Sequence, residues 1–148
     1  MSDWAHLEKL ATGDGFAVIT VIDDDGRPHA SVVTARPFPH PTSGARTVAF
    51  VVRGGARKLA HLRARPWASI TFRVGHDWIS ANGPVELAGP DDPHEGLAGG
   101  VADVPALLRD VFVAAGGTHD DWDEFDRVMV AERRTAVLIT PSRFLANR

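Results

Sequence analysis

Short runs of β-branched residues separated by turn signals constrain the fold of this chain more than any other feature. Residues 16–24 read FAVITVIDD, the dipeptide Asp25-Gly26 follows, and residues 29–38 read HASVVTARPF. Valine, isoleucine and threonine favour extended backbone, and Asp-Gly between two such runs is a strong signal of a β-hairpin. The sequence therefore predicts that the sheet begins with an antiparallel hairpin.

Four further runs of this kind predict four more strands, at residues 46–53, 67–73, 78–89 and 135–140. A proline-rich loop is expected at residues 37–44. Gly83-Pro84 inside the fifth run favours a bulge or an edge position, because proline has no N–H to donate to a neighbouring strand. Six strands with few helices between them predict a mainly β (α+β) domain, a six-stranded antiparallel barrel with peripheral helices.

Two short helices are expected within the first half of the chain. Trp4, Leu7 and Leu10 recur at helical spacing, with Ser2 or Asp3 as the N-cap and Gly13 at the end. The second helix is ARKLAHLRAR at residues 56–65, which Gly54-Gly55 opens and Pro66 ends.

The segment at residues 90–134 has a helical pattern and interrupts the strands before the last one. Asp103 with Pro105 is expected to start one helix, which ends at Gly116-Gly117, and Thr118 is expected to cap the next. The chain of 148 residues is thus predicted to form a single domain, with this helical insertion.

Composition excludes several functional classes. The chain has no cysteine, which removes disulfides, thiolate nucleophiles and Cys-ligated zinc or iron–sulfur sites. The net charge of −3 argues against a general nucleic-acid binder. The first residues, MSDWAHLEKL, lack the pattern of a signal peptide, and no apolar run reaches the length of a membrane span. A cytoplasmic protein is therefore expected.

The start of the helix at residues 56–65 has an unusual charge. The N-terminus of a helix is electropositive and favours acidic residues, yet this helix begins with Arg57 and Lys58, and Arg53 precedes it. A phosphate held by free N–H groups and the two cations would remove the repulsion. Solvated surface charges after a common Gly-rich turn explain the same residues, so the residues alone leave both interpretations open.

A resemblance adds context to this helix. FVVRGGARKLAHLRARPWASITF at residues 50–72, followed by WISANGPVEL at residues 78–87, resembles the pyridoxamine-phosphate oxidase-like split-barrel family. Within that family the sequence is more similar to the flavin/deazaflavin-dependent oxidoreductase branch. The resemblance implies an FMN-binding type of split barrel, FMN or the deazaflavin coenzyme F420 as cofactor, and a homodimer with the cofactor in a groove at the subunit interface.

The resemblance also implies a set of cofactor-binding residues. Arg57 and Lys58 match the pair that grips the cofactor phosphate, and the end of the third strand borders that phosphate. The second strand lines the ring system, and Trp78 stands where the family has a ring-contacting glutamine. The implied cofactor-binding residues are Ser31, Val32, Val33, Thr34, Val51, Val52, Arg53, Arg57, Lys58 and Trp78.

The sequence departs from true pyridoxamine-phosphate oxidases at several of these positions. Those enzymes have arginine at the position of Ser31, lysine at that of Arg36 and a hydroxyl residue at that of Val52. Their C-terminal substrate-binding Arg and His are not recognisable in TPSRFLANR. Oxidation of pyridoxamine phosphate is therefore not expected, and no catalytic residue is assigned.

Three other polar segments are interpreted as structural. His119-Asp120-Asp121-Trp122-Asp123-Glu124 matches neither an EF-hand loop nor a zincin motif, and acidic residues are favoured in a first helical turn, so no metal site is expected. Asp23-Asp24-Asp25-Gly26 is a hairpin turn. His94-Glu95 is a loop. His61, one turn after Arg57, is interpreted as a half-exposed helix histidine, with contact to the same anion as the alternative.

Two functions are expected from this sequence. The first is a flavin- or deazaflavin-dependent oxidoreductase, in which the cofactor exchanges hydride with a small molecule and the protein supplies a water-poor groove. The second is a protein that binds FMN, a deazaflavin or haem as a carrier, without catalysis.

Overall fold

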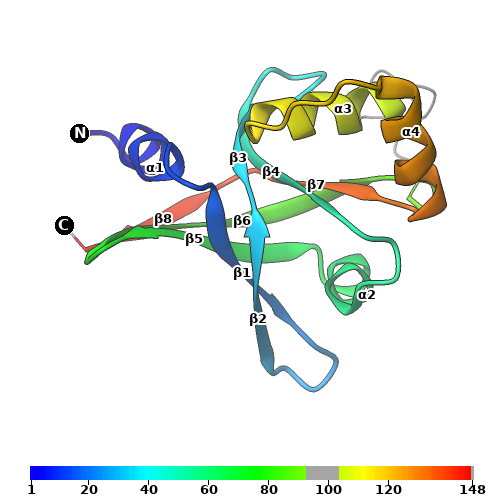
Figure 1. Cartoon of the computed structure of the whole chain (residues 1–148). Helices are drawn as coiled ribbons and strands as arrows, with labels where there is room; N and C mark the ends of the chain where they lie inside the picture. The colour runs from blue at the N-terminus through cyan, green and yellow to red at the C-terminus, as the bar shows by residue number, and fades with distance from the viewer. Residues whose placement is uncertain (93–103, 148) are drawn as a thin grey trace.

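The computed structural model describes residues 1–92 and 104–147, which form one antiparallel sheet system and four helices. In chain order the elements are α1 (Asp3–Ala11), β1 (Phe16–Ile22), β2 (Pro28–Thr34), β3 (Arg36–Pro39), β4 (Arg46–Val52), α2 (Arg57–Ala64), β5 (Trp67–Val74), β6 (Asp77–Ala88), α3 (Val104–Ala114), α4 (Trp122–Ala131), β7 (Thr135–Ile139) and β8 (Arg143–Ala146). Figure 1 shows the strands crossing as a strongly twisted barrel, with α1 and α2 at opposite ends.

The strands are ordered β2-β1-β5-β6-β7-β4-β3, and β8 pairs with β6. Every pairing is antiparallel, and the predicted hairpin forms β1 and β2, with Phe16 opposite Thr34 and Ile22 opposite Pro28. Strand β6 joins the two halves of the barrel, since its first part pairs with β5 and its last four residues pair with β7. The predicted antiparallel split barrel with peripheral helices is therefore confirmed.

The six predicted strands are present, and the described residues contain two more. Residues 36–39 are the edge strand β3 rather than the start of a loop, because Pro37 and Pro39 tolerate an edge position where one side needs no N–H. The C-terminal segment forms β8, whose Phe144 lies opposite Ala81.

No bulge forms at Gly83-Pro84, but one side of this dipeptide is open as at an edge, because it falls between the pairing of β6 with β8 at residues 79–82 and with β7 at residues 85–88. These residues lie inside β6, paired in continuous register with Ala68 and Trp67. Gly83 is needed for a different reason: a Cβ at this position would lie 2.1 Å from the carbonyl oxygen of Thr140. The missing side chain lets the chain after β7 cross directly over β6.

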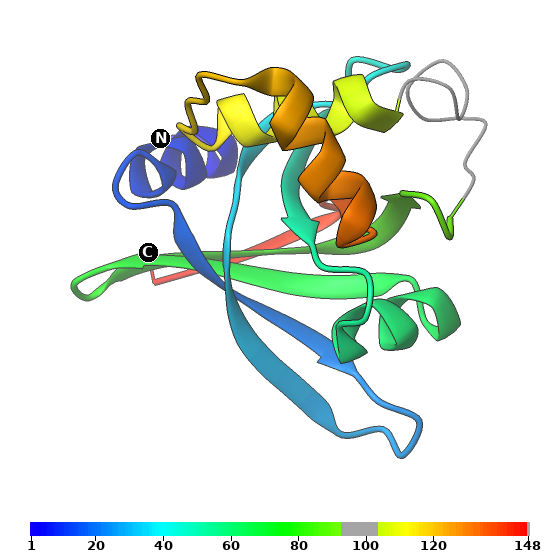
Figure 2. The ribbon, with the colours of Figure 1, turned by 45° about the vertical axis from the view of Figure 1, so that its right-hand side comes forward.

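Two apolar cores lie on opposite faces of β4 and β7. The first fills the barrel and includes Phe50, Ile70 and Phe72. The second joins the outer face of these strands to the insertion, where Leu138 packs with Phe125 and others. All five residues of β7 are buried, which explains its unbroken apolar run. The insertion thus covers one face of the barrel, as Figure 2 shows for α3 and α4.

The helices begin close to where the sequence predicts, with one correction. The Ser2 hydroxyl accepts from the backbone N–H of Ala5 at 3.1 Å and caps α1. Helix α4 is capped by Asp121, whose carboxylate accepts from the backbone N–H of Glu124 at 3.1 Å, and not by Thr118. The sequence contains two N-cap residues in succession, and the later one starts the helix. Asp103 and His94-Glu95 lie outside the described residues.

No helix in the described part of the chain is long and apolar enough to cross a membrane.

Candidate functional site: a groove that ends at a lysine

Two cavities meet at Lys58, near the start of α2. The larger is an open groove of about 640 Å³ between the barrel and the insertion. Its volume falls within the range of roughly 300–1,000 Å³ typical of sites for small molecules and cofactors. The groove is lined by Val32, Val33, Thr34, Val51, Val52, Arg53, Ala56, Lys58, Val111, Phe112, Ala115, Gly116, Gly117, Phe125, Met129 and Arg134.

The barrel supplies one wall of this groove, through the ends of β2 and β4. Val32, Val33 and Thr34 of β2, together with Val51 and Val52 of β4, are groove residues that the sequence predicts. The first wall is therefore formed largely by short apolar side chains. Such a surface suits the face of a flat ring system.

The insertion supplies the opposite wall, which the sequence does not predict. Phe112 of α3 and Phe125 of α4 pack with ring centroids 4.9 Å apart, and Met129 lies one turn further along α4. Arg109 of α3 donates to both carboxylate oxygens of Asp126 in α4, which holds the two helices together. This wall is thus an aromatic surface formed by α3 and α4, which the Arg109–Asp126 pair holds together.

Lys58 is the cation at which the groove ends. Burial lowers the pKa of its ammonium group. No carboxylate in the described residues pairs with it, although an ammonium removed from water needs a compensating negative charge. An anionic ligand is the group that would supply this charge.

The backbone at the start of α2 is also open to an acceptor. Ala56 takes the N-cap position without a side-chain cap, and the first turn contains no acidic residue. Within the described residues, the N–H groups of Arg57 and Lys58 have no hydrogen-bond acceptor. Two free donors, the helix dipole and two cations therefore converge at one place, as phosphate binding requires.

Arg53 and Arg134 line the same groove but are already paired. Glu132 accepts from Arg53 Nη2 at 2.5 Å and from Arg134 Nε at 3.1 Å. The two guanidinium groups, Arg134 first, hold the pKa of the Glu132 carboxyl below its usual range. Of the three groove cations, Lys58 is therefore the one without a counter-charge in the described residues.

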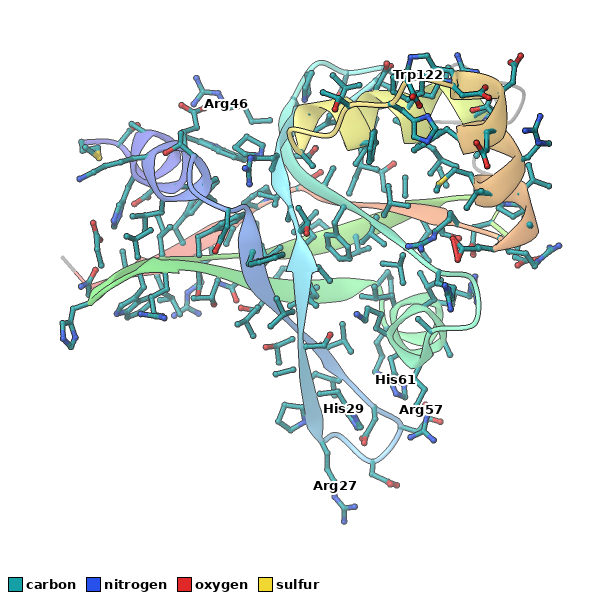
Figure 3. The ribbon with its side chains drawn as sticks, in the orientation of Figure 1. Arg27, His29, Arg46, Arg57, His61 and Trp122 are labelled. Carbon is teal, nitrogen blue, oxygen red and sulfur yellow. The ribbon has the colours of Figure 1, made fainter. Side chains whose placement is uncertain are left out.

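The smaller cavity, of about 170 Å³, lies between the β1–β2 hairpin and α2. Ser31 and Arg57, predicted with the groove residues, lie here instead, beside Lys58. Figure 3 shows His29, His61 and Arg57 gathered at this end of the molecule. The cavity is lined by Ile19, Val21, His29, Ala30, Ser31, Arg57, Lys58 and His61, so His61 does face the site of the predicted anion.

Trp78 lines neither of these cavities. It lies at the start of β6, opposite Arg73, at the other end of the β5–β6 ladder from α2. Its backbone N–H donates to the Asn147 side chain at 3.2 Å. Within this chain the structure therefore separates Trp78 from the nine other predicted cofactor-binding residues.

The two neighbouring polar segments have structural roles. The Asp23 carboxylate accepts from the backbone N–H groups of Asp25 and Arg27 at 2.9 and 2.8 Å, which confirms the hairpin turn. His119 Nδ1 accepts from the backbone N–H of Asp121 at 3.0 Å, so it organises the turn before α4.

Comparison with protein families decides the assignment. The model of the family described as pyridoxamine 5'-phosphate oxidase matches residues 4–143, which is nearly the whole chain. The chain belongs to the pyridoxamine 5'-phosphate oxidase family.

Solved structures share the fold at low sequence identity. A conserved hypothetical protein from Mycobacterium tuberculosis has 18% identity and a TM-score of 0.70, with 99% of this chain and 84% of that chain covered. An F420 reductase has 14% identity and a TM-score of 0.63, over 93% of this chain and 94% of that chain. A pyridoxamine 5'-phosphate oxidase-related, FMN-binding protein from Nostoc punctiforme has 16% identity and a TM-score of 0.63, over 94% and 76%. These similarities show the fold.

Proposed function

We propose that this chain binds a phosphate-bearing flavin or deazaflavin, with the ring system in the groove and the phosphate at Arg57 and Lys58. The observation that supports this most directly is Lys58, an ammonium whose pKa burial lowers and which has no carboxylate partner in the described residues. It lies where an apolar groove meets an uncapped helix N-terminus. The F420 reductase and the FMN-binding protein that share the fold support a flavin-type cofactor.

We propose further that the bound cofactor serves an oxidoreductase. The cofactor supplies the hydride chemistry, as a flavin or deazaflavin does in any such enzyme. The protein holds the ring between the valines of β2 and β4 and the aromatic side chains of α3 and α4, and it excludes water there. The described groove lining offers no carboxylate, histidine or tyrosine, so protons come from solvent or from the substrate itself.

Oxidation of pyridoxamine phosphate is not the proposed reaction. Arg36, which stands where the true oxidases have a lysine, donates from Nη2 to the carbonyl oxygen of Gly13 at 3.1 Å. Its guanidinium is therefore engaged by the segment between α1 and β1, and Arg36 is not among the residues that line the groove. Together with Ser31 and Val52, it leaves the groove without the polar contacts of those enzymes.

We propose a homodimer for a structural reason. Phe16 and Val18 of β1, Val32 of β2 and Trp67 of β5 are 58%, 40%, 63% and 53% exposed. Val18 lies directly opposite Val32, and all four side chains belong to the neighbouring strands β1, β2 and β5, so a second copy of the chain would cover exposed apolar surface there. Val32 also lines the groove, so the partner would border the cofactor. Light scattering tests this: the mass of two chains is expected, and a single-chain mass would refute it.

The experiment that tests cofactor binding is a titration of the protein with FMN and with coenzyme F420, followed by absorbance and fluorescence. Saturable binding of one of them is expected. The Arg57→Ala/Lys58→Ala variant should bind at least about tenfold more weakly, since each loses a charge-assisted contact. A matched control is Lys9→Ala/Arg73→Ala, which removes the same charge away from both cavities. No saturable binding by the unaltered protein would reject the proposal.

Turnover separates the oxidoreductase from a non-catalytic carrier. The cofactor-loaded protein should reduce or oxidise members of a broad panel of electron donors and acceptors faster than free cofactor does. Tight binding without acceleration would favour the carrier. A haem carrier is the weaker alternative, because the described groove lining offers Met129 but no histidine or cysteine to bind iron.

A further inference from the structure

The smaller cavity is lined by basic side chains beyond Arg57 and Lys58, the two that hold the proposed phosphate. Arg57, Lys58, His29 and His61 all line it, and no carboxylate does. Neither Arg57 nor Lys58 forms an ion pair with any described residue. A site of this composition is suited to an anion.

Position along α2 divides these groups into two sets. The free N–H groups of Arg57 and Lys58 lie at the very start of the helix. His61 lies one turn later, about 6 Å further along the axis at 1.5 Å per residue. The smaller cavity continues from Lys58, where the larger groove ends, past Arg57 to His61 and the hairpin residue His29, so it offers room for an acidic group beyond the first phosphate.

Neighbouring residues orient both imidazoles. His29 Nε2 lies 2.7 Å from Asp23 Oδ2, which leaves Nδ1 to donate to an anion when the ring is protonated. His61 Nδ1 lies 3.5 Å from Arg65 Nη2, which can only donate, so the proton of the neutral ring is on Nε2. The two rings pack with centroids 5.2 Å apart. Each histidine thus presents one ring nitrogen that no described residue occupies.

The carboxylates nearby do not occupy this site. Asp23 is engaged by the backbone N–H groups of Arg27 and Asp25 and by His29, and these hydrogen bonds, that from Arg27 first, hold its pKa below the usual range. Asp24 pairs with Arg65 at 3.0 Å. Asp23 therefore acts as a positioning residue for His29, and the cations that face the cavity remain free for a ligand.

From this arrangement we infer that His29 and His61 bind a second acidic group, which the cofactor carries beyond its first phosphate. The inference rests on the proposed function and narrows the cofactor to a phosphodiester with an acidic extension. That acidic group is either a carboxylate, as in the tail of coenzyme F420, or a second phosphate, as in FAD. FMN, which ends at its phosphate, would leave the histidines without a ligand.

The test compares FMN, FAD and coenzyme F420 in equilibrium titrations of the purified protein, with His61→Phe and His29→Phe as variants. Phenylalanine keeps a ring in the 5.2 Å contact and removes both nitrogens. Each variant should weaken the binding of F420 or FAD by about tenfold and leave that of FMN within about twofold. Whichever of F420 and FAD shows the loss identifies the extension as carboxylate or phosphate. His76→Phe, at an exposed turn away from both cavities, is the matched control.

Two results would overturn the inference alone: an equal loss for all three cofactors, which would place the histidines at the first phosphate, or no loss for any. Failure of the unaltered protein to bind any of the three would instead reject the proposed function, and the inference with it. Thermal unfolding of each variant shows whether it is folded, and Asp23→Asn gives an independent arm. It removes the negative charge that holds His29 and should weaken F420 or FAD, but not FMN.

Discussion

Gly54 lies directly against the backbone of Arg133, so that the turn before α2 touches the end of the insertion. A Cβ on Gly54 would lie 2.6 Å from the carbonyl oxygen of Arg133, and the Gly54 N–H donates to the carbonyl of Glu132 at 3.0 Å. The two glycines before α2 thus have different roles. Gly54 allows close packing against Arg133, whereas a Cβ on Gly55 would meet open space. This contact fixes the two sides of the groove relative to each other.

The Gly54→Ala substitution should therefore destabilise the fold. Backbone atoms must move to admit the methyl group, and overpacking of this kind typically costs about 1–3 kcal/mol. Chemical denaturation measures the loss. Gly55→Ala is the control and should change stability by less than about 0.5 kcal/mol. Equal effects of the two substitutions would contradict the packing role of Gly54.

Because the pKa of Lys58 is lowered, the free energy of unfolding is expected to depend on pH in the alkaline range. Its folded pKa is lowered, so the unfolded chain binds more protons, and the stability of the ligand-free protein rises as pH increases from the folded pKa toward the ordinary value of 10.5. Lys9 and Lys58 are the only lysines, and the sequence has no tyrosine or cysteine, so few other groups titrate in this range. Denaturation between about pH 8 and 11 measures the rise.

The Lys58→Met variant should remove that rise, and the Lys9→Met variant should retain it. The Met variant should also lose affinity for phosphate-bearing cofactors while keeping its stability near neutral pH, since it buries an apolar chain in place of an uncompensated cation. A pH dependence that is the same in both variants would show that Lys58 does not cause it.

Neutralising Glu132 should strengthen anion binding. The Glu132→Gln substitution releases Arg53 and Arg134 from their shared carboxylate at the rim of the groove. FMN or F420 should then associate faster by about two- to fivefold, an effect that added salt removes. Stopped-flow fluorescence measures it, with Glu8→Gln in α1 as a control of equal charge. Unchanged association rates would show that the two arginines do not act on the ligand.

The same carboxylate should affect stability in acid. Its folded pKa is depressed by Arg134 and Arg53, so its contribution is present above the unfolded value of 4.5 and is lost as pH falls through the folded pKa. Acid titration of stability should therefore be shallower below pH 4.5 in Glu132→Gln than in the unaltered protein. Identical acid profiles would count against the pairing.

Phe125 joins the second core to the groove and should affect both. It is 4% exposed, and Phe125→Ala is expected to cost about 3–5 kcal/mol of unfolding free energy and to weaken cofactor binding. Val128 is on the same helix and 42% exposed, so Val128→Ala should leave both unchanged. Calorimetry and the cofactor titration measure the two effects.

The elements that the sequence predicts correctly are those determined by residues close together in the chain. The hairpin around Asp25-Gly26 and the helix after Gly55 depend on neighbouring residues, and both form as predicted. Strand β8 depends on pairing with β6, more than sixty residues earlier, and its four residues, RFLA, are too few to show a pattern of their own. Asp121 replaces Thr118 as the cap of α4 because two capping residues compete within one turn.

The residues of the candidate site also divide into those that local sequence predicts and those that only packing brings together. Nine of the ten predicted cofactor-binding residues derive from one hairpin and one strand–helix junction: seven of them line the groove, and Ser31 and Arg57 line the smaller cavity. Phe112, Phe125 and Met129 were not predicted, because only packing brings the insertion onto β4. His29 could have been found from its place beside the Asp23 turn, at the register of Val21.

The insertion forms both a wall of the groove and part of the second core, and this limits how the groove can change during evolution. Phe125 belongs to the second core, so a substitution that reshapes the groove there also lowers stability. Ala115 and Gly116 line the groove from the end of α3 and lie outside that core. New ligand preferences are therefore most accessible through Ala115, where a larger side chain alters the shape of the groove and leaves the folding core intact, whereas the φ of 87° at Gly116 would strain any residue with a side chain.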